Sequence, residues 1–315
     1  MNKQTMEHKP IHNALRNALL IVNPKARQGA EAQLDEGIAQ LEQAGIKVER
    51  FASDGPEQSR QAVLERKNTL DLVIVGGGDG TISSMAGTLH ECQVPLAVLP
   101  LGTANDLARS LGLTGELPEA FAVIAEGHRR RIDLGVVNEH YFFNVAHLGL
   151  GVKVTEELTQ DVKKHWGVLS YLKAFVAALA RVKQFKASLS VDGVHYHQRS
   201  IQMAIGNGRY YGGGNVVDEN TRIDDGKLSL YSLRPQTVWE LLTLAPLLRD
   251  GRQRYNNRVF NVQARQIDIN TGRKRMAIHA DGEPVAHTPA KFYVLPRALE
   301  VLAPKPHEPE PHSDE

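Results

Sequence analysis

Short apolar runs alternate with amphipathic stretches along the first hundred residues, and this alternation constrains the fold more than any other feature. The apolar runs predict strands at residues 18–22, 46–51, 72–75 and 96–99. The stretches between them predict helices at residues 34–41, 56–67 and 81–90. Such βα alternation is typical of a mostly parallel, Rossmann-like sheet with helices on both faces, whose ligand sites lie beyond the carboxyl ends of the strands.

After about Asp133 the pattern changes to short strands, predicted at residues 187–191, 194–196, 201–205, 228–231 and 259–262. Turn signals lie near them at Asp192-Gly193, Asp225-Gly226 and Asp281-Gly282. Helices are predicted at residues 163–183 and 237–248. We therefore expect an α/β nucleotide-binding domain over residues 1–133, an antiparallel β-sandwich-like domain over 134–303 that takes the substrate, and a disordered tail over 304–315 rich in Pro, His and acids.

Bulk properties exclude several classes of protein. The formal net charge is +1, so no global basic field suggests nucleic-acid binding. No run approaches the roughly 20 apolar residues that cross a bilayer, and the polar start lacks a secretory signal. The single Cys92 cannot form an internal disulfide. We expect a folded cytoplasmic protein.

The most informative motif is Gly76-Gly77-Gly78-Asp79-Gly80-Thr81, between a predicted strand and a predicted helix. Glycines there let backbone N–H groups approach an anion, and Thr81 adds a hydroxyl donor. Asp79 would repel phosphate unless a divalent cation lay between them, which indicates a Mg²⁺-nucleotide. The alternative is a tight turn that binds nothing.

A second loop, Pro100 to Ala108, repeats this geometry one βα unit later with the sequence PLGTANDLA. Thr103 could donate a hydrogen bond to phosphate, and Asn105 and Asp106 would face the same crevice. Helix capping by Thr103 or Asn105 is the alternative. Because both loops follow parallel strands, they should open onto one edge of one sheet.

These two loops and the later Asp281-Gly282-Glu283 resemble the motifs of diacylglycerol kinases and bacterial YegS-like lipid kinases. The resemblance runs nearly end to end. It includes Asn23-Pro24 after the first strand and, further on, IDLG at 132–135, GNG at 206–208, GGG at 212–214 and DDG at 224–226. The glycine loop alone also resembles that of NAD kinases.

The resemblance implies a role for each motif. The nucleotide-contacting residues would be Asn23, Ser53, Gly77, Gly78, Asp79, Gly80, Thr81, Ser84 and Thr103. Asp79, Asp106, Asp133 and Glu283 would form an acidic network around Mg²⁺. A second, structural cation would lie near Asp225 with main-chain carbonyls of Arg222 and Lys227. Asp281 or Glu283 would be the general base that accepts the proton of the acceptor hydroxyl.

Two departures from the family pattern stand out. Ser83-Ser84 occupies the place where many relatives have Asn-Glu, which removes any contact made by that Glu. Lys153 stands near the place of an acidic residue in the sphingosine-kinase branch, which argues against a sphingoid base as acceptor.

The predicted function is ATP- and Mg²⁺-dependent phosphorylation of a hydroxyl on a membrane lipid of the diacylglycerol or phosphatidylglycerol type, in the cleft between the domains. A lipid acceptor implies transient membrane contact, for which the basic clusters at 163–164 and 129–131 are candidates, although a packed helix with solvated ends and a solvated loop are the favoured interpretations of these two clusters. Oligomeric state is left open. The alternatives are an NAD-kinase-like kinase of a soluble acceptor and an inactive nucleotide- or lipid-binding regulator.

Overall fold

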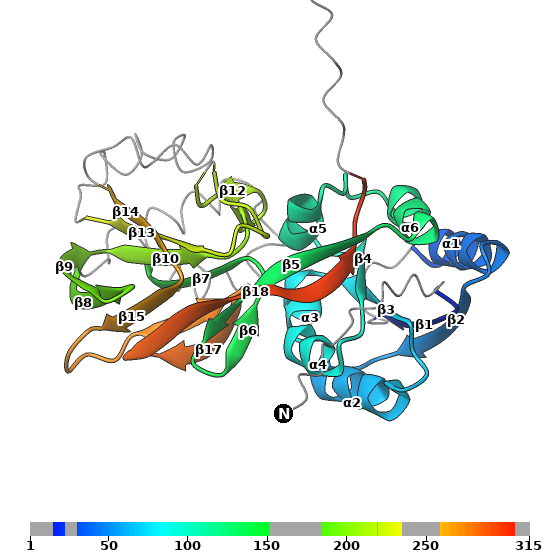
Figure 1. Cartoon of the computed structure of the whole chain (residues 1–315), viewed down its shortest axis with the longest axis horizontal. Helices are drawn as coiled ribbons and strands as arrows, with labels where there is room; N and C mark the ends of the chain where they lie inside the picture. The colour runs from blue at the N-terminus through cyan, green and yellow to red at the C-terminus, as the bar shows by residue number, and fades with distance from the viewer. Residues whose placement is uncertain (1–14, 23–29, 151–183, 219, 235–258, 306–315) are drawn as a thin grey trace, which may run out of the picture.

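The computed structural model describes residues 15–22, 30–150, 184–218, 220–234 and 259–305. They form an α/β domain and a β-rich domain that lie side by side and are joined by long strands (Figure 1). The fold class predicted from the sequence, a Rossmann-like domain followed by an antiparallel β-sandwich, is confirmed. The predicted helices at 163–183 and 237–248, and the predicted tail from residue 306 onward, lie outside the described residues.

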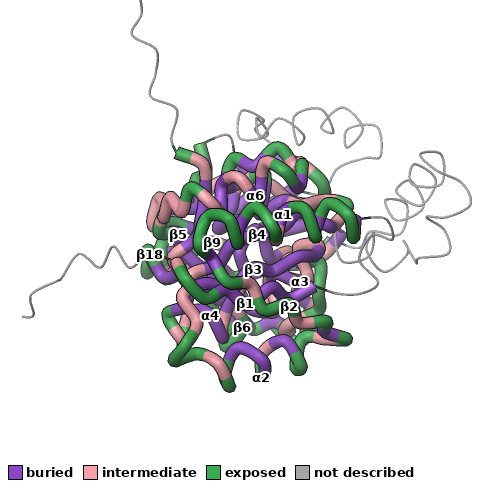
Figure 2. The backbone as a smooth tube through the Cα atoms, turned by 90° about the vertical axis from the view of Figure 1, so that its right-hand side faces the viewer, coloured by how far each residue is buried: buried purple, intermediate pink, exposed green. Residues whose placement is uncertain are grey.

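The α/β domain is built on four parallel strands in the order β2-β1-β3-β4. Their bounds are β1 Asn17–Val22, β2 Lys47–Ala52, β3 Leu72–Gly77 and β4 Leu96–Pro100. Every residue of β3 is buried, because helices cover both of its faces. Figure 2 shows this buried sheet between exposed helical surfaces.

Six helices flank the parallel sheet: α1 Glu31–Gln43, α2 Pro56–Arg66, α3 Asp79–Ser83, α4 Ala86–Cys92, α5 Asp106–Leu111 and α6 Leu117–Glu126. One apolar cluster packs α1 and α6 against one face of the sheet, and a second cluster packs α2, α4 and α5 against the other. This two-sided packing explains why the strands read as continuous apolar runs in the sequence.

The helix predicted over residues 81–90 is instead two helices, α3 and α4, separated at Ser84 and Met85. The Ser84 hydroxyl donates a hydrogen bond of 2.7 Å to the carbonyl of Thr81, one turn earlier. A serine hydroxyl that bonds to the preceding turn commonly bends a helix. Apolar periodicity continued through this break, which is why the sequence predicted one helix.

The β-rich domain contains a six-stranded antiparallel sheet in the order β14-β13-β10-β7-β16-β17. These strands are β7 Val145–Gly149, β10 Gln202–Gly206, β13 Leu228–Leu233, β14 Val259–Ala264, β16 Ala277–Ala280 and β17 Glu283–His287. It packs across an apolar core against β8 Phe185–Val191, β15 Gln266–Asn270 and β18 Ala290–Leu302. β9 Val194–Ser200 pairs with β8 through the predicted Asp192-Gly193 turn.

Two long strands connect the domains. β18 pairs with β15 in the β-rich domain and then with β4 of the parallel sheet, through Val301 and Leu96. β5, Arg129–Val137, pairs with β18 along most of this path, and β6, His140–Phe142, adds to β5. The predicted domain boundary after residue 133 falls inside β5. One continuous sheet therefore runs through both domains and joins them (Figure 1).

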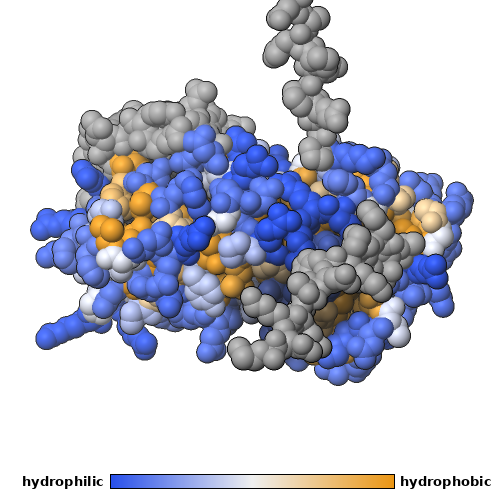
Figure 3. All heavy atoms as spheres, in the orientation of Figure 1, coloured by the Kyte–Doolittle hydropathy of each residue, from blue (hydrophilic) through white to orange (hydrophobic). Residues whose placement is uncertain are grey.

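The surface where the domains meet is strongly hydrophilic on the face shown in Figure 3. Arg129 pairs with Glu300 at 2.7 Å, and Arg130 donates two hydrogen bonds to Asp224. Part of the basic cluster that the sequence offered as a membrane contact is therefore engaged in ion pairs. Among the helices of the described ranges, none is both long enough and apolar enough to cross a bilayer.

Candidate active site

The two predicted phosphate loops meet at the carboxyl ends of β3 and β4. Gly77 lies opposite Pro100 in the parallel register, and the loops continue side by side beyond them. A Cβ atom on Gly102 would lie only 2.4 Å from the Cα of Gly78. Only glycine allows this approach, so both backbones can face the same small volume.

Asn105 holds the second loop in shape. It adopts a left-handed backbone conformation with φ of +51° at the start of α5. Its Oδ1 accepts a hydrogen bond of 2.9 Å from the Gly102 N–H, and its Nδ2 donates to the Gly102 carbonyl at 3.1 Å. Asn105 therefore stabilises the turn that brings Gly102 against Gly78, and it does not cap the helix through its side chain.

Two carboxylates lie where the loops meet. Asp79 Oδ1 accepts a hydrogen bond of 3.0 Å from the N–H of Leu107, which ties α3 to α5. Asp106 is buried and accepts from the N–H groups of Gly213, at 3.1 Å, and Gly214, at 2.9 Å, both from the β-rich domain. Burial raises the pKa of Asp106, and the charge of Asp79 raises it further. The two acids are thus close enough to repel each other.

Asp281 and Gly282 form the two-residue turn of the β16–β17 hairpin, with φ of +47° and +91°. The Asp281 carboxylate accepts four hydrogen bonds, from the N–H groups of Phe143, Asn144 and Val145 at 2.7 to 3.0 Å and from the Ser83 hydroxyl at 2.7 Å. Burial raises the pKa of Asp281 to about 6, while these four donors act in the opposite direction.

Glu283 follows this turn and reaches the glycine loop of the other domain. A Cβ atom on Gly80 would lie 3.2 Å from Glu283 Oε1, so the carboxylate rests directly against the first turn of α3. Residue 283 is exposed, and its side chain forms no hydrogen bond or ion pair with any residue that the structure describes. The structure therefore brings a free carboxylate to the predicted phosphate cradle from 200 residues away in the sequence.

Asp133 and Asp225 form a separate pair. Buried Asp133 accepts hydrogen bonds from the N–H groups of Gly226, at 2.6 Å, and Arg297, at 2.7 Å. Asp225 accepts from the N–H groups of Arg222 and Lys227 in its own turn. Burial raises the pKa of Asp225, and the Asp133 charge contributes to the increase.

Of the predicted acidic network, Asp79 thus lies with Asp106, whereas Asp133 lies beside Asp225 of the predicted structural cation site. Within the described ranges, no three His, Cys, Asp or Glu side chains lie together as a ready metal-binding set. The Arg222 carbonyl, a predicted metal ligand, accepts the Asp225 N–H at 3.4 Å.

The remaining predicted nucleotide contacts lie in varied settings. Thr103 is exposed beside Gly102, and Thr81 lies half-buried against Gly77. Ser53 is buried, and its hydroxyl bonds to the Gly55 carbonyl and to Ser59 at the start of α2. The Ser84 hydroxyl donates a hydrogen bond to the Thr81 carbonyl, one turn earlier. Asn23 lies outside the described residues.

Sequence reasoning missed the part that Ser83 plays. It treated Ser83 only as a departure from the family pattern, whereas the structure makes its hydroxyl a cross-domain donor to Asp281. The pairing of Asp106 with the Gly213 and Gly214 amides was missed as well, although both motifs had been recognised. Local sequence contains no signal for either contact, because each joins residues more than 100 positions apart.

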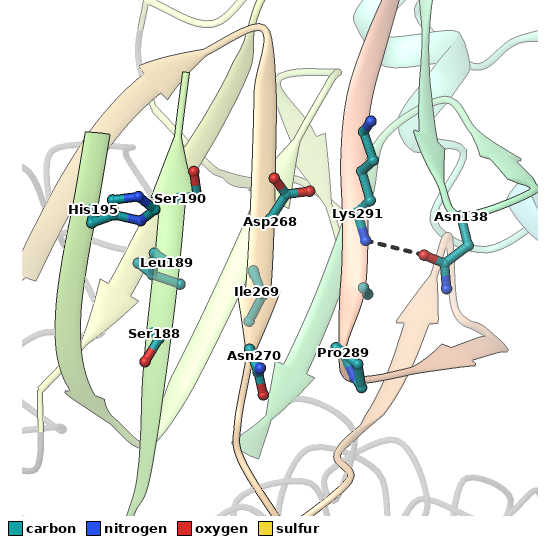
Figure 4. Close-up of a pocket in the computed structure, with 11 residues that line it drawn as sticks. Asn138, Ser188, Leu189, Ser190, His195, Asp268, Ile269, Asn270, Pro289 and Lys291 are labelled. Atoms are coloured by element: carbon teal, nitrogen blue, oxygen red, sulfur yellow. Dashed lines mark hydrogen bonds between the residues drawn. The ribbon is translucent and has the colours of Figure 1, made fainter. Parts of the chain in front are cut away.

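A hollow of about 470 Å³ lies elsewhere, on the outer face of β8, β15 and β18 (Figure 4). Ser188, Asp268 and Lys291 project from three neighbouring strands there, and the Lys291 N–H donates to Asn138 Oδ1 at 3.0 Å. None of the predicted site residues lines this hollow.

Comparisons with known proteins identify the family of both halves of the chain. Residues 17–137 match the diacylglycerol kinase catalytic domain, and residues 144–303 match the YegS C-terminal NAD kinase beta sandwich-like domain. A protein of Escherichia fergusonii named "Probable lipid kinase YegS" is 32% identical over 91% of this chain and 96% of its own length. A protein of Mycobacterium tuberculosis (strain H37Rv) named "Diacylglycerol kinase" is 30% identical over 90% of this chain and 94% of its own.

Solved structures support the fold in the same way. The crystal structure of a diacylglycerol kinase from Bacillus anthracis superimposes with a TM-score of 0.73 at 24% identity, covering 92% of this chain and 97% of that one. The two family matches, over residues 17–137 and 144–303, together cover both halves of the chain. The chain belongs to the diacylglycerol kinase and YegS-like lipid kinase family and is a lipid kinase.

Proposed function

We propose that this kinase transfers the γ-phosphoryl group of ATP, held with Mg²⁺, to a hydroxyl of a membrane lipid of the diacylglycerol or phosphatidylglycerol type. One observation carries the proposal. The unpaired Glu283 carboxylate from the β-rich domain lies against Gly80 of the glycine loop. Phosphoryl transfer needs little more than positioned phosphates, charge neutralisation and a group that accepts the hydroxyl proton.

The glycine loops have the features needed to bind the donor. The close approach of Gly78 and Gly102 brings the two loop backbones together with no side chain on either residue, and Thr81 and Thr103 add hydroxyl donors beside them. Asp79 and Asp106 would hold Mg²⁺, which neutralises charge on the phosphates. Burial is the main cause of the raised pKa of Asp106, and the nearby charge of Asp79 adds to it, so a bound cation would relieve the repulsion between the two carboxylates.

We assign the base to Glu283 and a positioning role to Asp281. All four acceptor contacts of Asp281 are already taken by Ser83 and three backbone N–H groups. Glu283 is exposed and has no such partners, so it can accept a proton from a bound hydroxyl. The left-handed turn at Asp281 and Gly282 directs β17 so that Glu283 reaches Gly80.

The Asp133–Asp225 pair is proposed to hold a second, structural cation. Burial raises the pKa of Asp225, and the nearby charge of Asp133 adds to this increase. Each of the two carboxylates accepts hydrogen bonds from backbone N–H groups. Access to a lipid acceptor further implies transient contact of a cytoplasmic enzyme with a membrane surface.

The direct test is transfer of labelled γ-phosphate from ATP with Mg²⁺ into mixed micelles that contain diacylglycerol or phosphatidylglycerol, with NAD in a parallel reaction. A labelled lipid supports the proposal and names the acceptor. Labelled NAD alone would replace the lipid with a soluble acceptor. ATP binding without any labelled product would indicate a regulator that has lost catalysis.

A further inference from the structure

The turn between the short strands β11, Tyr210–Tyr211, and β12, Asn215–Val216, lies against helix α5. Two arginine side chains meet beside this turn, and the proposed function gives neither of them a role. Arg109 of α5 and Arg209 beside β11 both lie over the ring of Tyr210, at 5.9 Å and 5.6 Å from its centroid. The two guanidinium groups come from different domains. They converge because the Gly213 and Gly214 amides bind Asp106, one turn before Arg109.

Arg209 lacks the partners that half-buried guanidinium groups ordinarily have, and Arg109 beside it is exposed. Among the described residues, neither forms an ion pair with a carboxylate, although Arg109 lies close enough to Asp106 to lower its pKa. Arg209 is half-buried, and its Nε is shielded from solvent without a hydrogen-bond partner. A shielded donor without an acceptor destabilises the folded protein, the more so when it is charged, unless a ligand satisfies it.

We propose that Arg109 and Arg209, gathered around Tyr210, form a binding site for a phosphate group of a substrate. Guanidinium groups bind phosphate oxygens through two parallel N–H donors, and the Tyr210 ring holds both cations in place. Gly214 lies beside this site, where an added Cβ would be 3.6 Å from the Arg109 guanidinium carbon. The glycine turn therefore leaves the guanidinium group accessible.

The position of this site relates it to the reaction. Asp106 connects the arginines to Asp79 through the Leu107 N–H, and Asp79 is followed by Gly80, against which Glu283 rests. A phosphate bound by the arginines belongs either to the nucleotide or to a phosphodiester in the headgroup of the acceptor. In the second case the site distinguishes a phosphatidylglycerol-type acceptor from diacylglycerol, which has no phosphate. The inference rests on the proposed function for the identity of these substrates.

The test compares Arg109→Gln and Arg209→Gln with Arg199→Gln, a change of an exposed arginine on β9. Equilibrium binding of a non-hydrolysable ATP analogue, short-chain phosphatidylglycerol and short-chain diacylglycerol is measured for each protein. We expect both site variants to bind one phosphate-bearing ligand at least tenfold more weakly, with diacylglycerol binding unchanged and Arg199→Gln like the parent. Weaker binding of the analogue assigns the site to the nucleotide, and weaker binding of phosphatidylglycerol assigns it to the acceptor.

Parent-like binding of both phosphate-bearing ligands by either site variant would overturn the inference, as would an equal loss of diacylglycerol binding. Arg209 is half-buried, so thermal unfolding of every variant is measured first. If Arg209→Gln does not fold, Arg209→Lys replaces it, and we expect a smaller loss because the charge stays while the two-pronged geometry is removed. If the parent protein phosphorylates no lipid, the proposed function is wrong. This outcome is distinct from failure of the phosphate site, because the binding measurements do not depend on turnover.

Discussion

The Ser83 hydroxyl donates a hydrogen bond of 2.7 Å to Asp281, 198 residues further along the chain. Ser83 ends helix α3, which begins in the glycine loop, and Asp281 begins the turn that leads to Glu283. This contact fixes the β-rich domain against the loop that would bind the nucleotide. The Ser-Ser sequence, which departs from the usual family pattern, thus supplies its own link between the two halves of the proposed site.

Removing the Ser83 hydroxyl should slow the reaction without unfolding the protein. A hydrogen bond to a charged group contributes about 1.5 to 3 kcal/mol, so we expect Ser83→Ala to lower kcat about tenfold or more. The KM for ATP should change little, because Ser83 lies at the end of α3 away from Gly78. Steady-state kinetics test this, with Ser190→Ala on the outer face of β8 as the matched control. A parent-like kcat would show that the contact does not position Glu283.

The rate should depend on pH through Asp281. Its pKa of about 6 means that it gains a proton as pH falls through this value. All four of its neighbours are donors, so the added proton has no acceptor and one hydrogen bond is lost. We expect kcat to fall below about pH 6, and the Ser83→Ala profile to fall at a higher pH, since the serine hydroxyl lowers the Asp281 pKa. A profile that is identical in the two proteins would contradict this assignment.

Glu283→Gln should abolish most of the activity while ATP still binds. The amide keeps the size of the side chain but cannot accept the hydroxyl proton, and general base catalysis contributes about 10²- to 10⁴-fold. We expect kcat to fall by that factor, measured by transfer of labelled phosphate to lipid. Glu139→Gln, in the exposed turn between β5 and β6, is the control. Substantial activity in Glu283→Gln would move the base to another residue.

Gly102→Ala should weaken ATP binding. The new Cβ would lie 2.4 Å from the Gly78 Cα and 2.8 Å from Asn105 Oδ1, so the two loops must separate. We expect the Kd for ATP to increase about tenfold or more, measured by calorimetric titration. Gly55→Ala is the matched control, because Gly55 has extended backbone and nothing within 4 Å of its added Cβ. Equal Kd values for the two variants would exclude the close approach as a requirement for binding.

Stability should depend on pH through His147. Burial and the adjacent ring of His279, at 5.9 Å, lower the His147 pKa from 6.5 to about 4. The unfolded chain takes up this proton near pH 6.5 and the folded protein only near pH 4, so stability is lost as pH falls between these values. We expect His147 to account for about 2 kcal/mol of the unfolding free energy lost between pH 7.5 and 5.

Urea unfolding at the two pH values measures this loss. His147→Phe should reduce it, because phenylalanine does not titrate. His195→Gln, a change at an exposed histidine on β9, should leave it as in the parent protein. An unchanged loss in His147→Phe would place the acid sensitivity elsewhere in the molecule.

Local sequence patterns predicted much of the fold because they report short-range physics. The strands β1, β3 and β4 could be predicted from their apolar runs, because a parallel sheet covered on both faces needs continuous apolar residues. The Asp192-Gly193 and Asp281-Gly282 hairpins were readable because their left-handed conformations favour these residues. The break between α3 and α4 was not readable, because it depends on how one serine hydroxyl is used.

By itself, the sequence determined the alternation of strands and helices in the first hundred residues, the two glycine loops and the acidic residues available for chemistry. Only the tertiary structure decided which acids meet: Asp79 lies with Asp106, Asp133 lies with Asp225, and Glu283 reaches Gly80. These encounters depend on how β5 and β18 join the two domains. Contacts between residues more than 100 positions apart arise from packing of the whole chain, so no local pattern encodes them.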